Sequence, residues 1–233
     1  MPPSEHISKQ YDADLEALHT QVLQMGGLVE RQVLAAIDSF TNENVDRLDD
    51  VLHTEREVNR LELAMDEECA HIIARRQPTA SDLRLVLSIS KTVTDLERIG
   101  DEAAKIARMG KQILGREGIQ VPRLTDVSHS AHRAVGMLRH ALDAYARLDA
   151  TAATIIIRED ETIDQEFRAI LRQLITFMME DPRTISTALD IIWIAKAIER
   201  IGDHAKNIAQ YVIFIADGVD VRHLKSQTTT TAT

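Results

Sequence analysis

The sequence contains one cysteine and few aromatic, glycine or proline residues. Cys69 is the only cysteine among 233 residues, so no disulfide can form within the chain and no zinc-finger or redox spacing exists. Aromatic residues make up 3% of the chain, which disfavours β-rich folds because these usually rely on aromatic and β-branched side chains. Nine glycines and five prolines leave long uninterrupted stretches, and these favour helices.

The chain also lacks a membrane-spanning run, an export signal and an excess of positive charge. No stretch of about 18 apolar residues occurs, and the N-terminal residues do not form the basic and then apolar run of an export signal. The net charge of −10 disfavours binding to the backbone of a nucleic acid or to anionic lipid. We therefore predict a cytoplasmic protein that binds no nucleic acid and reaches a membrane only through its partners.

The sequence does contain the hydrophobic pattern of long helices. Hydrophobic residues form 44% of the chain and recur at steps of three and four, as on the buried face of an amphipathic helix. The pattern and its breaks predict six helices: 7–40, a second ending before Pro78, a third from Thr79 or Ser81 to Ile113, 126–148, 151–179, and a sixth reaching about residue 215. Trp193, Phe177, Met178 and Met179 are also predicted to lie in the core, since Met-rich runs more often fill gaps than form a cofactor pocket.

Helix breakers are densest at Gly115, Gly118 and Pro122, which places a domain boundary there. We predict a first three-helix bundle over residues 1–115, a linker over 116–122, a second three-helix bundle over 123–217 and a flexible tail over 218–233. An internal repeat supports this division, because similar residues recur 102 to 105 positions apart. The expected fold is all-α, with two tandem pseudo-symmetric bundles of long antiparallel helices.

The most similar part of the repeat is a charged segment. Glu97-Arg98-Ile99-Gly100-Asp101 recurs unchanged as Glu199-Arg200-Ile201-Gly202-Asp203. Packing alone would preserve only the apolar positions, so the identical acids and glycines indicate a further role. A mid-helix glycine costs about 1 kcal/mol relative to alanine, which suggests that another group approaches each helix closely at that point.

Carboxylates four residues apart lie on one face of a helix, so each half presents an acidic stripe. Facing helices can pool these oxygens, which suit magnesium, calcium, manganese, iron or zinc. The predicted metal ligands are Glu97 and Asp101 with Glu62 and Asp66 in the first half, and Glu199, Asp203 and Asn207 with Asp160 and Asp164 in the second. His204 could add a nitrogen ligand. A single acidic pair is more often a solvated face, and the duplication is what favours metal binding.

The same segments resemble the PhoU family, together with Val58-Asn59-Arg60-Leu61-Glu62, the Arg76-Gln77-Pro78 turn and the stretch from Gly202 to Ala209. The resemblance covers residues 7–217. It implies two tandem three-helix bundles whose acidic motifs hold metal clusters, commonly iron or zinc. It also implies a regulator that acts with the phosphate-specific ABC transporter and with PhoR, the membrane histidine kinase of the phosphate regulon, which stays repressed when phosphate is plentiful.

The resemblance implies no reaction, and the sequence shows no phosphate-binding P-loop, dinucleotide fingerprint or kinase signature, so we predict no enzymatic activity. Long amphipathic helices with alanine-rich faces favour self-association, and we predict a homodimer. Two alternatives stay open: a metal-dependent helical enzyme, such as a phosphatase or di-metal oxidase, and a purely structural helical dimer without metal.

The two halves differ at one position of the acidic stripe. Lys105 stands where the second half has Asn207, and a protonated ammonium group cannot bind a metal. We therefore expect Lys105 to pair with Asp101, so that the first face neutralises itself and only the second half binds metal.

Overall fold

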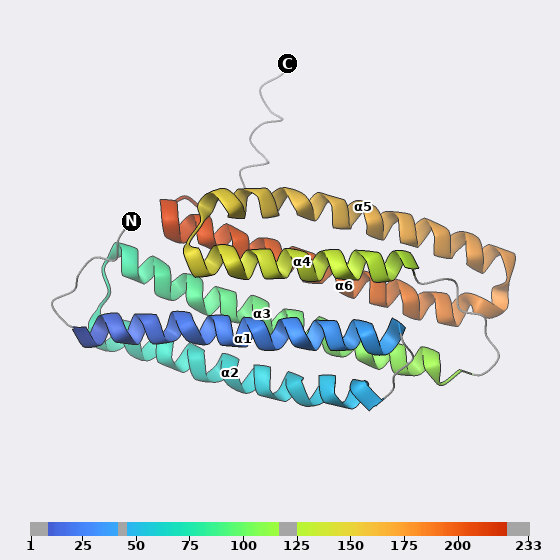
Figure 1. The fold of residues 1–233 in the computed structure, drawn as a ribbon, viewed down its shortest axis with the longest axis horizontal. Coiled ribbons are helices and arrows are strands. Elements are labelled where there is room, and N and C mark those ends of the chain that lie inside the picture. The colour runs from blue at the N-terminus through green and yellow to red at the C-terminus, as the bar shows by residue number, and fades with distance from the viewer. Residues whose placement is uncertain (1–8, 42–45, 117–124, 223–233) are drawn as a thin grey trace, which may run out of the picture.

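The computed structural model of the protein describes residues 9–41, 46–116 and 125–222. These residues form six long α-helices and one 3₁₀ turn, with no strand among them (Figure 1). The elements are α1 (Lys9–Thr41), α2 (Asp46–Arg76), α3 (Ala80–Leu114), α4 (Thr125–Arg147), α5 (Ala150–Glu180), η1 (Pro182–Thr184) and α6 (Ile185–Asp217). The predicted all-α fold is confirmed.

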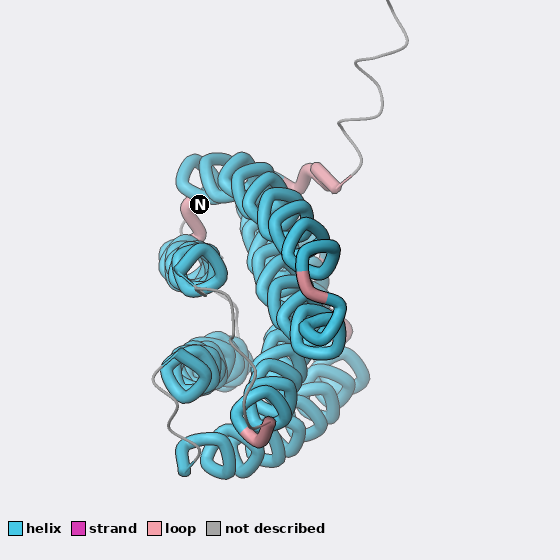
Figure 2. Tube along the Cα trace, turned by 90° about the vertical axis from the view of Figure 1, so that its right-hand side faces the viewer, coloured by secondary structure: helices cyan, strands magenta, loops and turns pink. Residues whose placement is uncertain are grey.

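The six helices form two three-helix halves that lie along each other, α1–α3 and α4–α6 (Figures 1 and 2). Among the described helices, the most extensive contact joins α3 to α6, so the last helix of each half forms the seam between the halves. α1 and α4 also touch across this junction. The helices that carry the duplicated charged segment are therefore neighbours in space.

The helix ends follow local backbone chemistry. Asp149 caps α5, because its side chain accepts a hydrogen bond from the Ala152 amide at 2.9 Å. Asp181 and Pro182 separate α5 from α6, and Gly218 ends α6 with a left-handed φ of 74°. Most of the predicted linker, at 117–122, and the part of the predicted tail from 223 onward lie outside the described residues.

The core follows the predicted periodicity, but the separate prediction of four large apolar core residues was wrong for two of them. Leu96, Ile99 and Ile106 on α3 are fully buried. Trp193 and Met179, predicted to be buried, are 52% and 79% exposed. Both lie on outward faces of α6 and α5, and a large apolar residue is no proof of burial. Phe177 and Met178, predicted with them, are half-buried.

No helix in the described part of the chain combines the length and the apolar character needed to cross a bilayer.

Candidate functional site

The predicted first-half acids lie on two facing helices. Glu62 and Asp66 belong to α2, and Glu97 and Asp101 belong to α3. Burial, together with the charges of Asp101 and Glu62, raises the pKa of Glu97 to about 7. Burial and the charges of Asp66 and Asp101 likewise raise the pKa of Glu62. The Glu62 carboxylate is therefore close enough to the other three for their charges to interact unfavourably.

No lysine or arginine in the described residues forms an ion pair with any of these four acids. Arg98 acts only from a distance, where its charge lowers the pKa of Glu97 and of Glu62. The Ser90 hydroxyl donates a hydrogen bond to Asp66 at 2.7 Å. The first-half face thus carries a concentration of negative charge with no ammonium or guanidinium group bonded to it.

The second-half acids lie on α5 and α6, and here a lysine joins them. Lys206 Nζ lies 2.5 Å from Asp160 Oδ2 and 3.9 Å from Asp203 Oδ1. Burial and the charges of Asp160 and Glu199 raise the pKa of Asp203, and the charge of Lys206 opposes them. Glu199 accepts a separate hydrogen bond from Lys196 at 2.5 Å. This face therefore already holds two of the protein's own cations among its four carboxylates.

The half whose acidic face holds a lysine is the opposite of the one expected. Lys105 does not pair with Asp101; its Nζ donates to Glu102 Oε2 at 3.3 Å and lies 5.6 Å from the centre of the Trp193 ring. The lysine that neutralises an acidic face is Lys206, which stands where the first half has Ala104. One residue shifts a side chain by about 100° around a helix, so Lys105 meets α6 while Lys206 meets α5.

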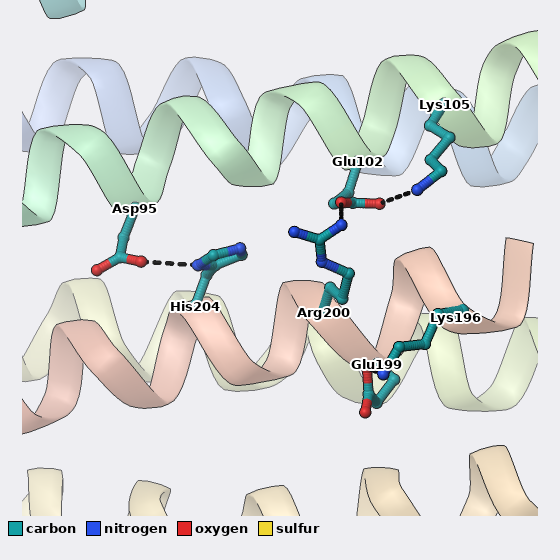
Figure 3. A network of polar contacts seen from close by, with 7 residues as sticks. All are labelled: Asp95, Glu102, Lys105, Lys196, Glu199, Arg200 and His204. Atoms are coloured by element: carbon teal, nitrogen blue, oxygen red, sulfur yellow. Dashed lines mark hydrogen bonds and ion pairs between the residues drawn. The ribbon is translucent and has the colours of Figure 1, made fainter. Parts of the chain in front are cut away.

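Two predicted second-half ligands belong to the seam instead. His204 Nδ1 lies 2.7 Å from Asp95 Oδ1, and Asn207 Nδ2 donates to the same oxygen at 3.2 Å. Figure 3 shows His204 pointing across to Asp95 on α3. Because the carboxylate can only accept, the histidine carries its proton on Nδ1. We therefore leave Asn207 and His204 out of the metal site.

A second buried carboxylate lies further along the seam. Glu102 is 5% exposed and accepts from Lys105 and, at 2.7 Å, from Arg200 Nη1 (Figure 3). Arg200 thus joins the two halves. Sequence reasoning missed Asp95 and Glu102 because it looked for residues repeated in both halves. At the equivalent positions of the second half stand Ala197 and His204, which are not acids.

The repeated glycines mark close contacts between helices. A Cβ at Gly100 would lie 3.0 Å from Gln32 Oε1, and one at Gly202 would lie 2.8 Å from Ile163 Cδ1. Gln32 is buried and donates to the carbonyl oxygens of Val51 and Gly100 at 3.2 and 3.3 Å, which joins α1, α2 and α3. The group that approaches each glycine is therefore a side chain of a neighbouring helix.

The side chains do not form a complete metal cage. Within the described ranges, no three histidine, cysteine, aspartate or glutamate side chains are grouped closely enough to hold a metal ion. Carboxylates that repel one another with no cation between them are expected to turn apart. The donor set of the first half still fits a divalent cation, since it offers four carboxylates and no bonded basic group.

Comparison with known proteins places the chain in a family. The PhoU domain matches it twice, over residues 22–109 and 127–212, once in each half of the fold. The chain belongs to the PhoU family. A phosphate-specific transport system accessory protein PhoU homolog from Pseudomonas putida is 48% identical over 221 residues, which cover 95% of this chain and 86% of that protein.

Other PhoU proteins agree with this assignment. The phosphate-specific transport system accessory protein PhoU of Escherichia coli strain K12 is 45% identical over 221 residues, covering 95% of this chain and 91% of that protein. The crystal structure of PhoU from Pseudomonas aeruginosa superposes with a TM-score of 0.87 at 46% identity and covers 90% of this chain and 100% of that one. The fold is therefore that of the PhoU family.

Replacing Glu97 in the first PhoU domain with glutamine is expected to stabilise the metal-free protein above pH 7. The pKa of Glu97 rises from 4.5 to about 7 on folding. Between these values the folded protein holds a proton that the unfolded chain has lost, so stability falls as pH rises from 4.5 to about 7. Allowing for solvent screening of this partly exposed group, the variant should gain about 1 to 2 kcal/mol above pH 7.

Urea unfolding at about pH 8 and at pH 4.5 measures this difference, which should vanish at the lower pH. Glu199→Gln in the second PhoU domain is the matched control. It removes a carboxylate that Lys196 already neutralises, so no gain is expected. If Glu97→Gln stabilised the protein equally at both pH values, its charge could not be the cause.

Proposed function

We propose that the protein regulates phosphate uptake as an accessory to the phosphate-specific ABC transporter. We also propose that the protein helps to keep the histidine kinase PhoR repressed when phosphate is plentiful. The observation that carries the proposal is the PhoU domain in both halves, together with relatives named as accessory proteins of the phosphate-specific transport system. The proposed role is one of binding and regulation, with no reaction assigned to the protein.

Deleting the gene tests this role directly. Phosphate-starvation genes should switch on in phosphate-rich medium, because the kinase would no longer be held inactive, and a reporter fused to one such promoter measures the change. Reintroducing the wild-type gene should restore repression. Deletion in a strain that lacks the kinase should leave the reporter off, which separates loss of repression from a general defect in growth. An unchanged reporter in the single deletion would count heavily against the regulatory role.

The proposal includes metal ions on the acidic faces, with iron, zinc, manganese and magnesium as candidates. Glu62, Asp66, Glu97 and Asp101 would hold the ion in the first half, and Asp160, Asp164, Glu199 and Asp203 in the second. Support comes from the repulsion among the first-half carboxylates, which a divalent cation would relieve. When bound, the metal would join α2 to α3 and stiffen that face, or bridge to a carboxylate of a partner protein.

We further propose that the first half binds metal more tightly than the second. The second-half carboxylates already hold Lys206, and an incoming cation would have to displace it. The proposal also includes a homodimer, which is supported by the exposed apolar side chains of Ile185, Leu189 and Trp193 at four-residue intervals on α6. Light scattering on the purified protein would measure the number of subunits.

A further inference from the structure

A cleft of about 660 Å³ opens where the two halves of the molecule meet. Its lining comes from the end of α1, the start of α2 and the start of α4, so both halves contribute. None of the proposed metal ligands lines it. Next to it, the buried side chains of Phe40, Ile106 and Val127 line a narrower apolar hollow that shares Ile37 with the cleft. The cleft is therefore a separate feature of suitable size for a small molecule.

The cleft is positively charged on a strongly acidic chain. Its lining includes Arg31 and Arg47 against the single carboxylate of Asp38, which gives +2 − 1 = +1 with His132 neutral, whereas the whole chain carries −10. Arg47 Nη1 lies 2.5 Å from Asp38 Oδ2, which leaves its other N–H groups for a ligand. Arg31 forms no ion pair within the described residues. One guanidinium group from α1 and one from α2 are thus available to a ligand in the cleft.

The side of the cleft formed by α4 adds further polar groups. His132 Nδ1 lies 2.7 Å from the Ser128 carbonyl oxygen, and because a carbonyl can only accept, Nδ1 carries the proton. Nε2 then stays available to accept a proton from a ligand or, once protonated, to donate one. Ser128 lies in the first turn of α4, where the helix dipole favours an anion. The C-terminal end of α1 also borders the cleft, and the negative end of its helix dipole acts against an anion there.

We propose that this cleft binds a phosphate dianion, either free or as the phosphate group of a small organic ester. The planar fork of arginine matches phosphate oxygens bidentately, and two such groups line the cleft together with the imidazole of His132. The apolar side chains of Leu34 and Ile37 supply a surface for an organic group next to the phosphate. A ligand here would connect α1 and α2 with α4, and so link the two halves.

This assignment does not depend on the regulatory role, since it concerns binding to the purified protein. Equilibrium dialysis of the chelator-treated protein would be carried out with inorganic phosphate and with adenosine 5′-monophosphate at millimolar concentrations. Arg31→Gln and Arg47→Gln should each weaken binding about tenfold or more, as expected for loss of a charged hydrogen bond. Tighter binding of the nucleotide assigns the site to a phosphate ester, and tighter binding of inorganic phosphate assigns it to the free ion.

Arg172→Gln is the matched control, because it removes the same charge from an exposed position on α5 outside the cleft. It should leave binding unchanged, and thermal melts should show that all three variants are folded. Adenosine without phosphate should not bind. Absence of saturable binding of either phosphate compound would overturn the proposal. So would an equal loss of binding in Arg172→Gln, since the effect would then come from overall charge.

Discussion

Replacing Asp95 with alanine is expected to lower the free energy of unfolding by about 3 to 5 kcal/mol. The Asp95 carboxylate is 3% exposed and lies on α3 at the seam between the halves. It accepts hydrogen bonds from His204 and Asn207 on α6 at 2.7 and 3.2 Å. Burial and the charge and hydrogen bond of Asp95 also raise the pKa of Tyr211 on the same helix. Removing the acceptor would leave several buried donors without a partner.

Urea unfolding followed by circular dichroism measures this loss. A double-mutant cycle with His204→Ala should give a coupling energy of about 1 to 3 kcal/mol, because the two residues are in direct contact. Asp49→Ala is the matched control: that side chain is 76% exposed and lies 3.5 Å from Lys111, so its loss should cost less than about 1 kcal/mol. If Asp95→Ala cost no more than this control, apolar packing alone would hold the seam.

Replacing Glu97 with alanine is expected to weaken metal binding in the first half by at least about 10- to 100-fold. Even a group that only supports a ligand contributes this much in metal sites, and Glu97 lies close to two of the other first-half acids, since Asp101 and Glu62 both act on its pKa. Lys206→Met should have the opposite effect in the second half. It removes an ammonium group 2.5 Å from Asp160, and affinity there should rise about tenfold.

Titration of the chelator-treated protein with Mn²⁺, followed by the electron paramagnetic resonance of the free ion, measures both effects. Lys105→Met is the matched control, because Lys105 contacts Glu102 and Trp193 and none of the proposed ligands; it should leave metal binding unchanged. Equal metal loss in Glu97→Ala and Glu199→Ala would contradict the proposed preference for the first half. A larger gain in metal affinity from Lys105→Met than from Lys206→Met would instead mean that Lys105 neutralises the first acidic face.

The helices and their buried faces could be predicted because they depend on the spacing of apolar residues within one segment of the chain. The seam residues Leu96, Ile99, Ile198 and Ile201 recur at short helical steps, and all are buried. Apolar character alone failed for Trp193, because hydrophobicity does not say whether a neighbouring helix covers that part of the surface. The positions of Asp95 and Glu102 could not be predicted either, because their partners lie on another helix about 100 residues away.

The sequence by itself determined that Glu97 and Asp101, like Glu199 and Asp203, share a helical face, because a spacing of four residues is a property of one helix. It also determined the family through the duplicated segments. Only the tertiary structure decided which cation lies among which carboxylates. The rotation of each helix against its neighbours directs Lys206 to Asp160 and Lys105 to Glu102, and packing between helices sets that rotation.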